Sequence, residues 1–213
     1  MKILGTKTSL VTRANLYGLE ESIIASGFPK LEQYSSNKFN PNVLEKRDYK
    51  RANILSSCAL GTGHDNFLCG IIVQFNLTAP RYLWHEVQRY HFMDIVSCTS
   101  TMHMLLPILK SSTDEQNLQS YFSSNTPELI INYFYNQTKN ILEDTSLSEE
   151  EKLVAIKTIL PEGWLQTGRL TTNFRQLKTI YTQRRNHRLP EWREFCLWLE
   201  NIPGSQLIIG EKK

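Results

Sequence analysis

The sequence has 213 residues, of which 40% are hydrophobic and 21% are charged, and its formal net charge is +3. That composition is typical of a soluble globular protein, and the charge is too small to indicate nucleic-acid binding by itself. No window approaches the roughly 18 consecutive apolar residues that a membrane span needs. No repeat, low-complexity run or linker interrupts the chain. We therefore predict one domain over residues 1–213, with neither a membrane nor a nucleic acid among its partners.

The four cysteines form no close pair and no CxxC motif; they are Cys58, Cys69, Cys98 and Cys196. This spacing argues against a zinc site and is typical of a reducing compartment. The first 16 residues have no sustained apolar run and no small-residue cleavage site, so we expect no signal peptide. Together these features predict a cytoplasmic protein without a structural metal.

The first half of the chain alternates between short strands and helices. A β-rich segment predicts a strand over Lys2–Thr12, and a short helix is expected over Leu19–Ser26, followed by a loop over 28–39. Asn40 and Pro41 suit the N-cap and first position of a helix that runs to Leu60, where Gly61-Thr62-Gly63 stops it. Alternation of Val73, Phe75 and Leu77 with polar neighbours predicts a strand over Phe67–Leu77.

The second half is dominated by helices with recognisable first turns. A polar loop is expected over Lys110–Asn117 and a short strand over Leu165–Thr171. The predicted helices begin at Thr126-Pro127, at Ser148 with three acidic residues after it, at Asn173 and at Pro190. They end near Leu142, Leu160, Thr182 and Leu199.

The stretch from Pro80 to His103 concentrates the polar chemistry of the chain. Pro80 suits the first turn of a helix. At about 100° per residue, four side chains of this helix share an arc of about 100°: Arg81, His85, Gln88 and Arg89. Leu83, Val87 and Tyr90 fall on the far side, and Glu86 lies at the edge of the polar face. A face with several cationic donors suits a phosphate, a carboxylate or an electron-rich ring.

A run of small polar residues follows this helix, from Ser97 to Thr101. Their hydroxyls and backbone N–H groups suit a loop that holds a ligand oxygen. A solvated helix face followed by a simple Ser/Thr loop explains the same residues equally well. Cys98 lies near His91 and His103 in the sequence, but an inert cysteine explains it better than a nucleophile does.

Arg184 is the second residue that a helical wheel singles out. It shares a stripe of about 60° with Asn173, Leu177 and Ile180, so it is expected to point inward. An inward arginine needs an anion or an acceptor as partner. The alternative is an arginine that reaches the surface at the helix C-terminus, where the helix dipole favours it. The basic turn of 184–188 is better explained as solvated than as an RNA-binding surface.

No P-loop, GxGxxG or HExxH motif is present, but the order of features resembles the flavin-dependent thymidylate synthases. Gly63-His64 precedes a strand, and Ala79-Pro80 opens a helix that ends in Arg89-Tyr90-His91, where that family has Arg-His-Arg. Ser97 and Ser100 are similar to the serines of its substrate loop. Lys157 to Pro161 is similar to its Arg-x-x-Leu-Pro, and Thr172 to Leu177 is similar to its Val-Asn-Ala-Arg-Ser-Leu. The resemblance covers residues 50–195.

The resemblance implies a flavin site, a nucleotide site and a reaction. FAD would contact His64, Asn66, Arg89, Tyr90, His91, Asn173 and Arg175. The nucleotide dUMP would contact Glu86, Ser97, Cys98, Ser100, Lys157 and Arg184. The implied reaction is reductive methylation of dUMP to dTMP, in which methylenetetrahydrofolate supplies the carbon and NADPH reduces the flavin. Arg184 would polarise the uracil, and it is the residue that we expect to matter most for catalysis.

The resemblance also implies an α+β fold, with a mostly antiparallel sheet flanked by helices, in a homotetramer whose sites draw on several subunits. Several positions depart from the family pattern. Met102 and His103 stand where the family has Arg and Tyr, Cys98 replaces a Glu, and Cys69-Gly70 replaces a Glu-His pair. Met102 cannot bind a phosphate as an arginine does. Two further hypotheses therefore stay open: a flavin- or nucleotide-binding relative without synthase activity, and a scaffold that retains only the assembly.

Overall fold

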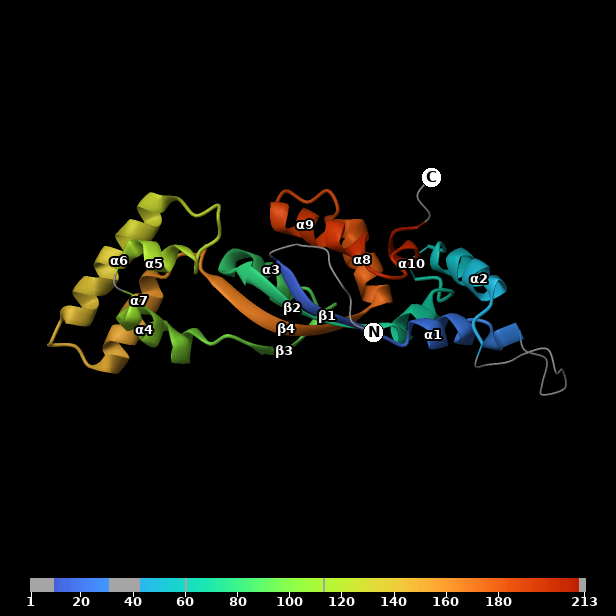
Figure 1. Ribbon diagram of the computed structural model, residues 1–213, viewed down its shortest axis with the longest axis horizontal. Coiled ribbons are helices and arrows are strands. Elements are labelled where there is room, and N and C mark those ends of the chain that lie inside the picture. The colour runs from blue at the N-terminus through green and yellow to red at the C-terminus, as the bar shows by residue number, and fades with distance from the viewer. Residues whose placement is uncertain (1–9, 31–42, 60, 113, 211–213) are drawn as a thin grey trace. The chain divides into compact units, whose positions relative to one another are not determined.

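The computed structural model of the chain describes residues 10–30, 43–59, 61–112 and 114–210 (Figure 1). Its centre is a four-stranded antiparallel sheet with the strand order β1-β2-β4-β3. The strands are β1 Val11–Tyr17, β2 Ile72–Pro80, β3 Asp94–Cys98 and β4 Leu165–Asn173. The sheet is flanked by helices, so the predicted α+β fold is confirmed.

Ten α-helices and two short 3₁₀ helices are found in the described residues. The α-helices are α1 Leu19–Ala25, α2 Lys46–Ser56, α3 Arg81–Arg89, α4 Thr101–Ser111, α5 Glu115–Gln119, α6 Glu128–Glu143, α7 Glu149–Ile159, α8 Phe174–Arg184, α9 Pro190–Leu199 and α10 Gln206–Ile209. The 3₁₀ helices are η1 Phe28–Lys30 and η2 Asn66–Gly70. Within the described residues, no helix combines the length and the apolar character that crossing a membrane requires.

The chain divides into two compact units, which we call the first and the second unit. The first unit comprises the described residues of Met1–Leu77, His91–Val96 and Arg169–Lys213. The second unit comprises Thr78–Tyr90 and the described residues of Ser97–Gly168. The prediction of a single domain stays a prediction.

The core of the first unit forms where α9 packs on β2. Side chains alternate along β2, so that Val73, Phe75 and Leu77 are buried, as the sequence pattern predicted. The ring centroid of Phe75 lies 5.6 Å from that of Phe195 and 5.2 Å from that of Trp198. These tilted aromatic contacts fix α9 over the strand.

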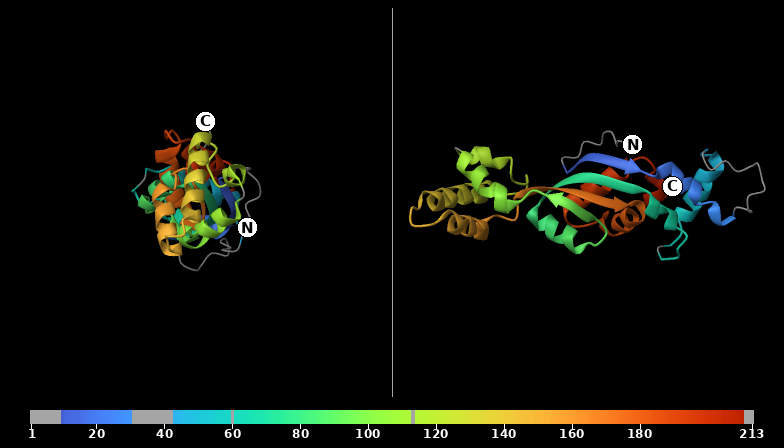
Figure 2. Two further views of the ribbon diagram at one scale, coloured as in Figure 1. Left: turned by 90° about the vertical axis from the view of Figure 1, so that its left-hand side faces the viewer. Right: turned by 90° about the horizontal axis from the view of Figure 1, so that it is seen from below.

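The second unit has a separate hydrophobic core, in which α4, α5, α6 and α7 lie side by side (Figure 2). Its centre is Trp164, whose ring meets those of Phe122 and Phe134 edge to face at centroid distances of 5.3 Å and 6.2 Å. Around these rings pack buried aliphatic side chains, namely Leu105, Leu109, Leu118, Ile131, Ile156 and Leu160. The core therefore ties α7 to the segment that leads into β4.

Several predicted helix boundaries are confirmed because their caps are local. Ser148 and Glu151 form the capping box of α7. The Asn173 side chain accepts a hydrogen bond from the backbone N–H of Gln176 and so caps α8. Pro190 occupies the first turn of α9. The predicted starts of α1 and α6 are correct to within a residue or two.

Other boundaries were wrong. The helix predicted over Asn40–Leu60 begins at Lys46, after a capping box of Glu45 and Asp48, and it ends at Ser56. Asn40 and Pro41 lie outside the described residues. The first residues of the predicted strand Phe67–Leu77 form η2, and the strand itself begins at Ile72. The polar segment Lys110–Asn117 holds the end of α4 and the start of α5.

Two strands differ from the sequence-based prediction. The first strand runs over Val11–Tyr17, whereas Lys2–Thr12 was predicted, and residues 2–9 lie outside the described part. The register of β1 against β2 shifts between Thr12 and Asn15, and Arg13 in this bulge has φ 48°. The second difference is β3, which takes in Ser97 and Cys98 of the predicted loop. All five residues of β3 are exposed, so no apolar alternation marks this edge strand.

The aromatic core of the first unit predicts which side chains of α9 carry stability. Phe195 is 2% exposed, whereas Leu197 on the same helix is 58% exposed. We expect Phe195→Ala to lower the free energy of unfolding by ~3–5 kcal/mol, because it leaves a cavity between α9 and β2. The matched variant Leu197→Ala should change it by no more than ~0.5 kcal/mol. Urea denaturation measures both, and equal losses would contradict this packing.

Candidate functional site

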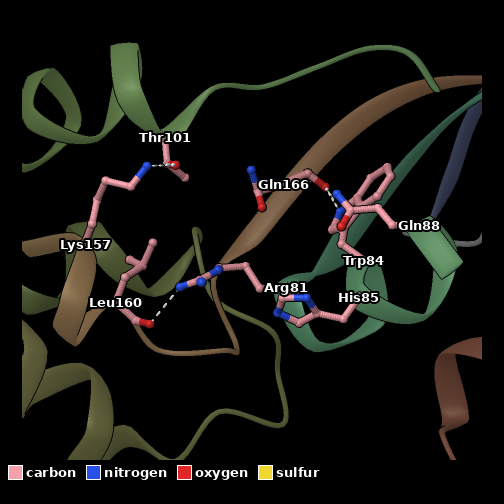
Figure 3. Close-up of a pocket in the computed structure, with 8 residues that line it drawn as sticks. All are labelled: Arg81, Trp84, His85, Gln88, Thr101, Lys157, Leu160 and Gln166. Carbon is pink, nitrogen blue, oxygen red and sulfur yellow. Dashed lines mark hydrogen bonds between the residues drawn. The ribbon is translucent and has the colours of Figure 1, made fainter. Parts of the chain in front are cut away.

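The second unit contains a polar pocket of about 210 Å³ beside α3 (Figure 3). Its lining comes from α3, the first turn of α4, the end of α7 and the start of β4; the residues are Arg81, Trp84, His85, Gln88, Thr101, Lys157, Leu160 and Gln166. Three of the four residues of the predicted polar face of α3 therefore line one pocket. The fourth, Arg89, is exposed at the helix end and does not line it.

The orientation of α3 follows from how its first N–H groups are satisfied. The backbone N–H of Arg81 donates to Trp164 O at 3.1 Å, and that of Tyr82 donates to Glu162 O at 3.3 Å. The first N–H groups of a helix have no partner within the helix, so the segment after α7 provides one. Trp84 adds a third bond, from its indole Nε1 to Gln166 O at 3.1 Å.

Close packing explains a glycine in β4. A Cβ on Gly168 would lie 2.5 Å from the Trp84 ring, so only glycine lets the strand approach the buried indole. No motif or periodicity in the sequence singles out Gly168. It is nevertheless part of what places α3, and hence the pocket, against β4.

Arg81 is held by the segment that follows α7. Its Nη1 donates to Leu160 O at 2.9 Å, and its Nη2 lies 3.5 Å from a carboxylate oxygen of Glu162. The second Glu162 oxygen lies 3.4 Å from His85 Nε2. The side chain of Glu162 is 52% exposed, so these ion pairs are weak and screened by water.

Lys157 supplies the other cation of the pocket. Its Nζ lies 3.3 Å from Thr101 Oγ1 and 3.1 Å from Met102 Sδ. No carboxylate of the described residues lies within ion-pair distance of this ammonium group. Figure 3 shows the Lys157, Arg81 and Gln166 side chains entering the pocket from three different elements. The arrangement suits a small anion, because two cations, a hydroxyl and an amide converge there.

In the first unit, a buried carboxylate joins the segment at 64–66 to α8. Asp65 is fully buried, with one oxygen 3.2 Å from Arg175 Nε and the other 3.0 Å from Lys178 Nζ. Lys178 also donates to Cys58 O at 3.0 Å. The predicted flavin residues His64 and Asn66 flank Asp65, and both are exposed. The ion pair with Asp65 therefore places Arg175 next to the segment that carries His64 and Asn66.

Sequence reasoning missed both Asp65 and Lys178. Lys178 follows Leu177 on a helix whose other buried residues are apolar, and 113 residues separate it from its partner. A lysine in a buried helical position signals that an acid must lie nearby. It does not tell which acid that is.

The other predicted site residues lie at varied positions. Arg184 ends α8 beyond the buried Leu177 and Ile180, and its guanidinium lies 5.2 Å from the ring centroid of Trp192. Ser100 caps α4 by accepting a bond from the backbone N–H of His103. Ser97, Cys98, Arg89 and His91 are exposed, whereas Glu86 and Tyr90 are half-buried. Among the described residues, no three His, Cys, Asp or Glu side chains gather as a metal site would require.

Comparison with known proteins places this geometry on a known scaffold. No family model matches the sequence, and no curated protein matches it. The solved structures that match the fold include two of thymidylate synthase X (ThyX) from Helicobacter pylori, a flavin-dependent enzyme solved with FAD and dUMP. The chain has the ThyX fold.

The likeness extends over nearly the whole of both chains. The first ThyX structure has a TM-score of 0.69 at 17% identity and covers 93% of this chain and 98% of its own. The second has a TM-score of 0.67 at 17% identity and covers 100% of both. At that identity the likeness shows the fold, and what the pocket binds has to be argued from its own residues.

The buried ion cluster of the first unit gives a stability prediction. We expect Asp65→Asn to lower the free energy of unfolding by ~3–5 kcal/mol, because Arg175 and Lys178 then lose their shared counter-charge. Asp94→Asn is the matched control, since Asp94 is exposed, and should change the free energy by no more than ~0.5 kcal/mol. Urea unfolding measures both variants. An Asp65→Asn protein as stable as the wild type would show that the cluster is dispensable.

Proposed function

We propose that this chain is a flavin- and nucleotide-binding protein that acts as an FAD-dependent thymidylate synthase. The reaction is the reductive methylation of dUMP to dTMP, with methylenetetrahydrofolate and NADPH as co-substrates. The observation that carries the proposal is the cationic pocket of the second unit, on a scaffold that resembles ThyX over its full length. Lys157 lines that pocket, and it is one of the six residues that the family resemblance assigns to the nucleotide.

The donor set of this chain fits a flavin with an anionic diphosphate. Arg89 and His91 are exposed, and neither has a carboxylate partner among the described residues. A cation of this kind binds a phosphate through charge-assisted hydrogen bonds. His64, Asn66 and Tyr90 would hold the remainder of the cofactor. FAD, when bound, supplies the hydride-transfer chemistry of the reaction.

Asn173 and Arg175 have a second role that limits what they contribute. The Asn173 side-chain oxygen caps α8, and Arg175 pairs with Asp65. Both side chains are half-exposed, so each has a face for a ligand while its structural bond persists. In this proposal they orient the flavin and do not move a proton.

For the nucleotide, the family resemblance assigns residues that are far apart in the chain. Lys157 would bind the phosphate, and the resemblance assigns further nucleotide contacts to Glu86, Ser97, Cys98 and Ser100. Arg184 would polarise the uracil carbonyl. Its guanidinium lies 5.2 Å from the ring centroid of Trp192, within the range of a cation–π contact.

A binding protein without synthase activity is the second candidate. The observation that favours it is the presence of Met102 and Cys98 where the related enzymes have Arg and Glu. Met102 Sδ contacts Lys157 at 3.1 Å and offers no charge of its own.

We further propose a homotetramer in the cytoplasm. The support is the edge strand β3, in which Val96 is 60% exposed, because an apolar edge strand favours pairing with another chain. A scaffold without ligands is the third candidate.

The direct test is to titrate the purified protein with FAD and then to assay dTMP formation by chromatography with dUMP, methylenetetrahydrofolate and NADPH. We expect a yellow protein that forms dTMP. Lys157→Gln should reduce dUMP affinity by about tenfold or more, because a charged phosphate contact is lost, while FAD affinity stays unchanged. The matched control is Lys139→Gln, a change at an exposed lysine of α6.

The outcomes separate the candidates. Bound FAD and dUMP without dTMP would favour the binding protein that lacks synthase activity. A protein that binds neither FAD nor dUMP would contradict the proposal and favour the third candidate, a scaffold without ligands.

A further inference from the structure

We propose that Arg81 is a phosphate-binding residue of this chain, and that Arg81 and Lys157 together form a subsite for a phosphate monoester. Arg81 supplies the second cation at the pocket where Met102 provides none. The proposal rests on the proposed function, because it names the residues that recognise the nucleotide. It adds a residue outside the motifs that suggested a nucleotide site.

The charges of the pocket match a phosphate monoester. Such a group carries between −1.5 and −2 charges near neutral pH and three acceptor oxygens. Arg81 and Lys157 enter the same pocket of about 210 Å³ from α3 and α7, and Thr101 and Gln166 add neutral polar groups. A single lysine neutralises only part of that charge. Two cations balance this charge, and together with the Thr101 hydroxyl they supply enough donors for the three oxygens.

The Arg81 guanidinium has N–H donors that its two contacts within the chain do not use. A guanidinium has five N–H groups, of which one donates to Leu160 O and a second faces Glu162 at 3.5 Å. The remaining N–H groups are free to form the fork that binds two phosphate oxygens at once. The bond to Leu160 O also holds the side chain in place before any ligand arrives, and such preorganisation lowers the cost of binding.

Glu162 competes with a bound phosphate for the Arg81 guanidinium. Its carboxylate is half-exposed, and it is shared between Arg81 at 3.5 Å and His85 at 3.4 Å. Exposed ion pairs of this length contribute little, whereas a guanidinium binds a phosphate through short, charge-assisted bonds. A phosphate is therefore expected to displace Glu162 from Arg81. Glu162 is a positioning residue here, because it acts on the ligand only through Arg81.

The competing explanation is that Arg81 is structural and only fixes the segment 160–162 against α3. The two explanations differ in what neutralising Glu162 does. If Arg81 binds phosphate, Glu162→Gln frees it and removes a repelling carboxylate, so phosphate affinity stays or rises. If Arg81 is only a structural tie, Glu162→Gln weakens the same tie as Arg81→Gln and both variants lose stability together.

The experiment compares dUMP with 2′-deoxyuridine, which lacks the phosphate, by calorimetry on the full chain. We expect the wild type to bind dUMP more tightly than deoxyuridine. Arg81→Gln should reduce dUMP affinity about tenfold or more, with deoxyuridine and FAD affinities unchanged. Arg81→Lys, which keeps the charge but loses the fork, should fall between the two. Glu162→Gln should bind dUMP at least as well as the wild type does. The control variant Lys139→Gln should bind dUMP with wild-type affinity.

The result that overturns the proposal is wild-type dUMP affinity in both Arg81 variants, or an equal loss of dUMP affinity in Glu162→Gln and Arg81→Gln. If Arg81→Gln does not fold, Arg81→Lys and Glu162→Gln decide the question by the same criteria. A wild type that binds FAD but binds dUMP no better than deoxyuridine overturns the subsite while the flavin part of the proposed function stands. Phosphate-dependent binding through Arg81 without FAD binding supports the subsite while the proposed function fails.

Discussion

The second unit depends on one backbone connection. β2 ends at Pro80 and α3 begins at Arg81, so the strand runs directly into the helix. The N–H groups of Arg81 and Tyr82 then bond to Trp164 O and Glu162 O. Because these groups would otherwise lack partners, the segment after α7 must lie against the start of α3. That placement turns the polar face of α3 toward Lys157 and so creates the pocket.

The same connection links the charged residues of the pocket to the aromatic core of the second unit. Trp164 accepts the Arg81 bond through its backbone, while its ring lies at the centre of the aromatic core of the second unit. Arg81 and the base of the pocket are thus anchored to a rigid core, whereas Glu162 and His85 remain exposed at the rim. Arg81 is a donor that is already held in place, and its ion pair with the exposed Glu162 is weak. A ligand anion can therefore replace Glu162 as the partner of Arg81.

Periodicity and local caps were enough to predict much of this from the sequence. The helical wheel of residues 81–89 identified three pocket residues, and the caps of α7 and α8 were read from Ser148 and Asn173. The partners of these residues were not predictable, because each is distant in the chain. Asp65 meets Lys178 across 113 residues, and Arg184 faces a tryptophan that no periodicity assigns to it. β3 escaped prediction since an edge strand exposed on all five residues has no apolar pattern.

We propose that this chain uses the ThyX fold to bind a nucleotide phosphate at Arg81 and Lys157. A crystal structure of the protein grown with FAD and dUMP tests it most directly, because it locates the phosphorus atom. We expect phosphate oxygens within hydrogen-bond distance of the Arg81 guanidinium and of Lys157 Nζ, with Glu162 moved away from Arg81. Density for dUMP with its phosphate outside this pocket, and Arg81 still paired with Glu162, would contradict it.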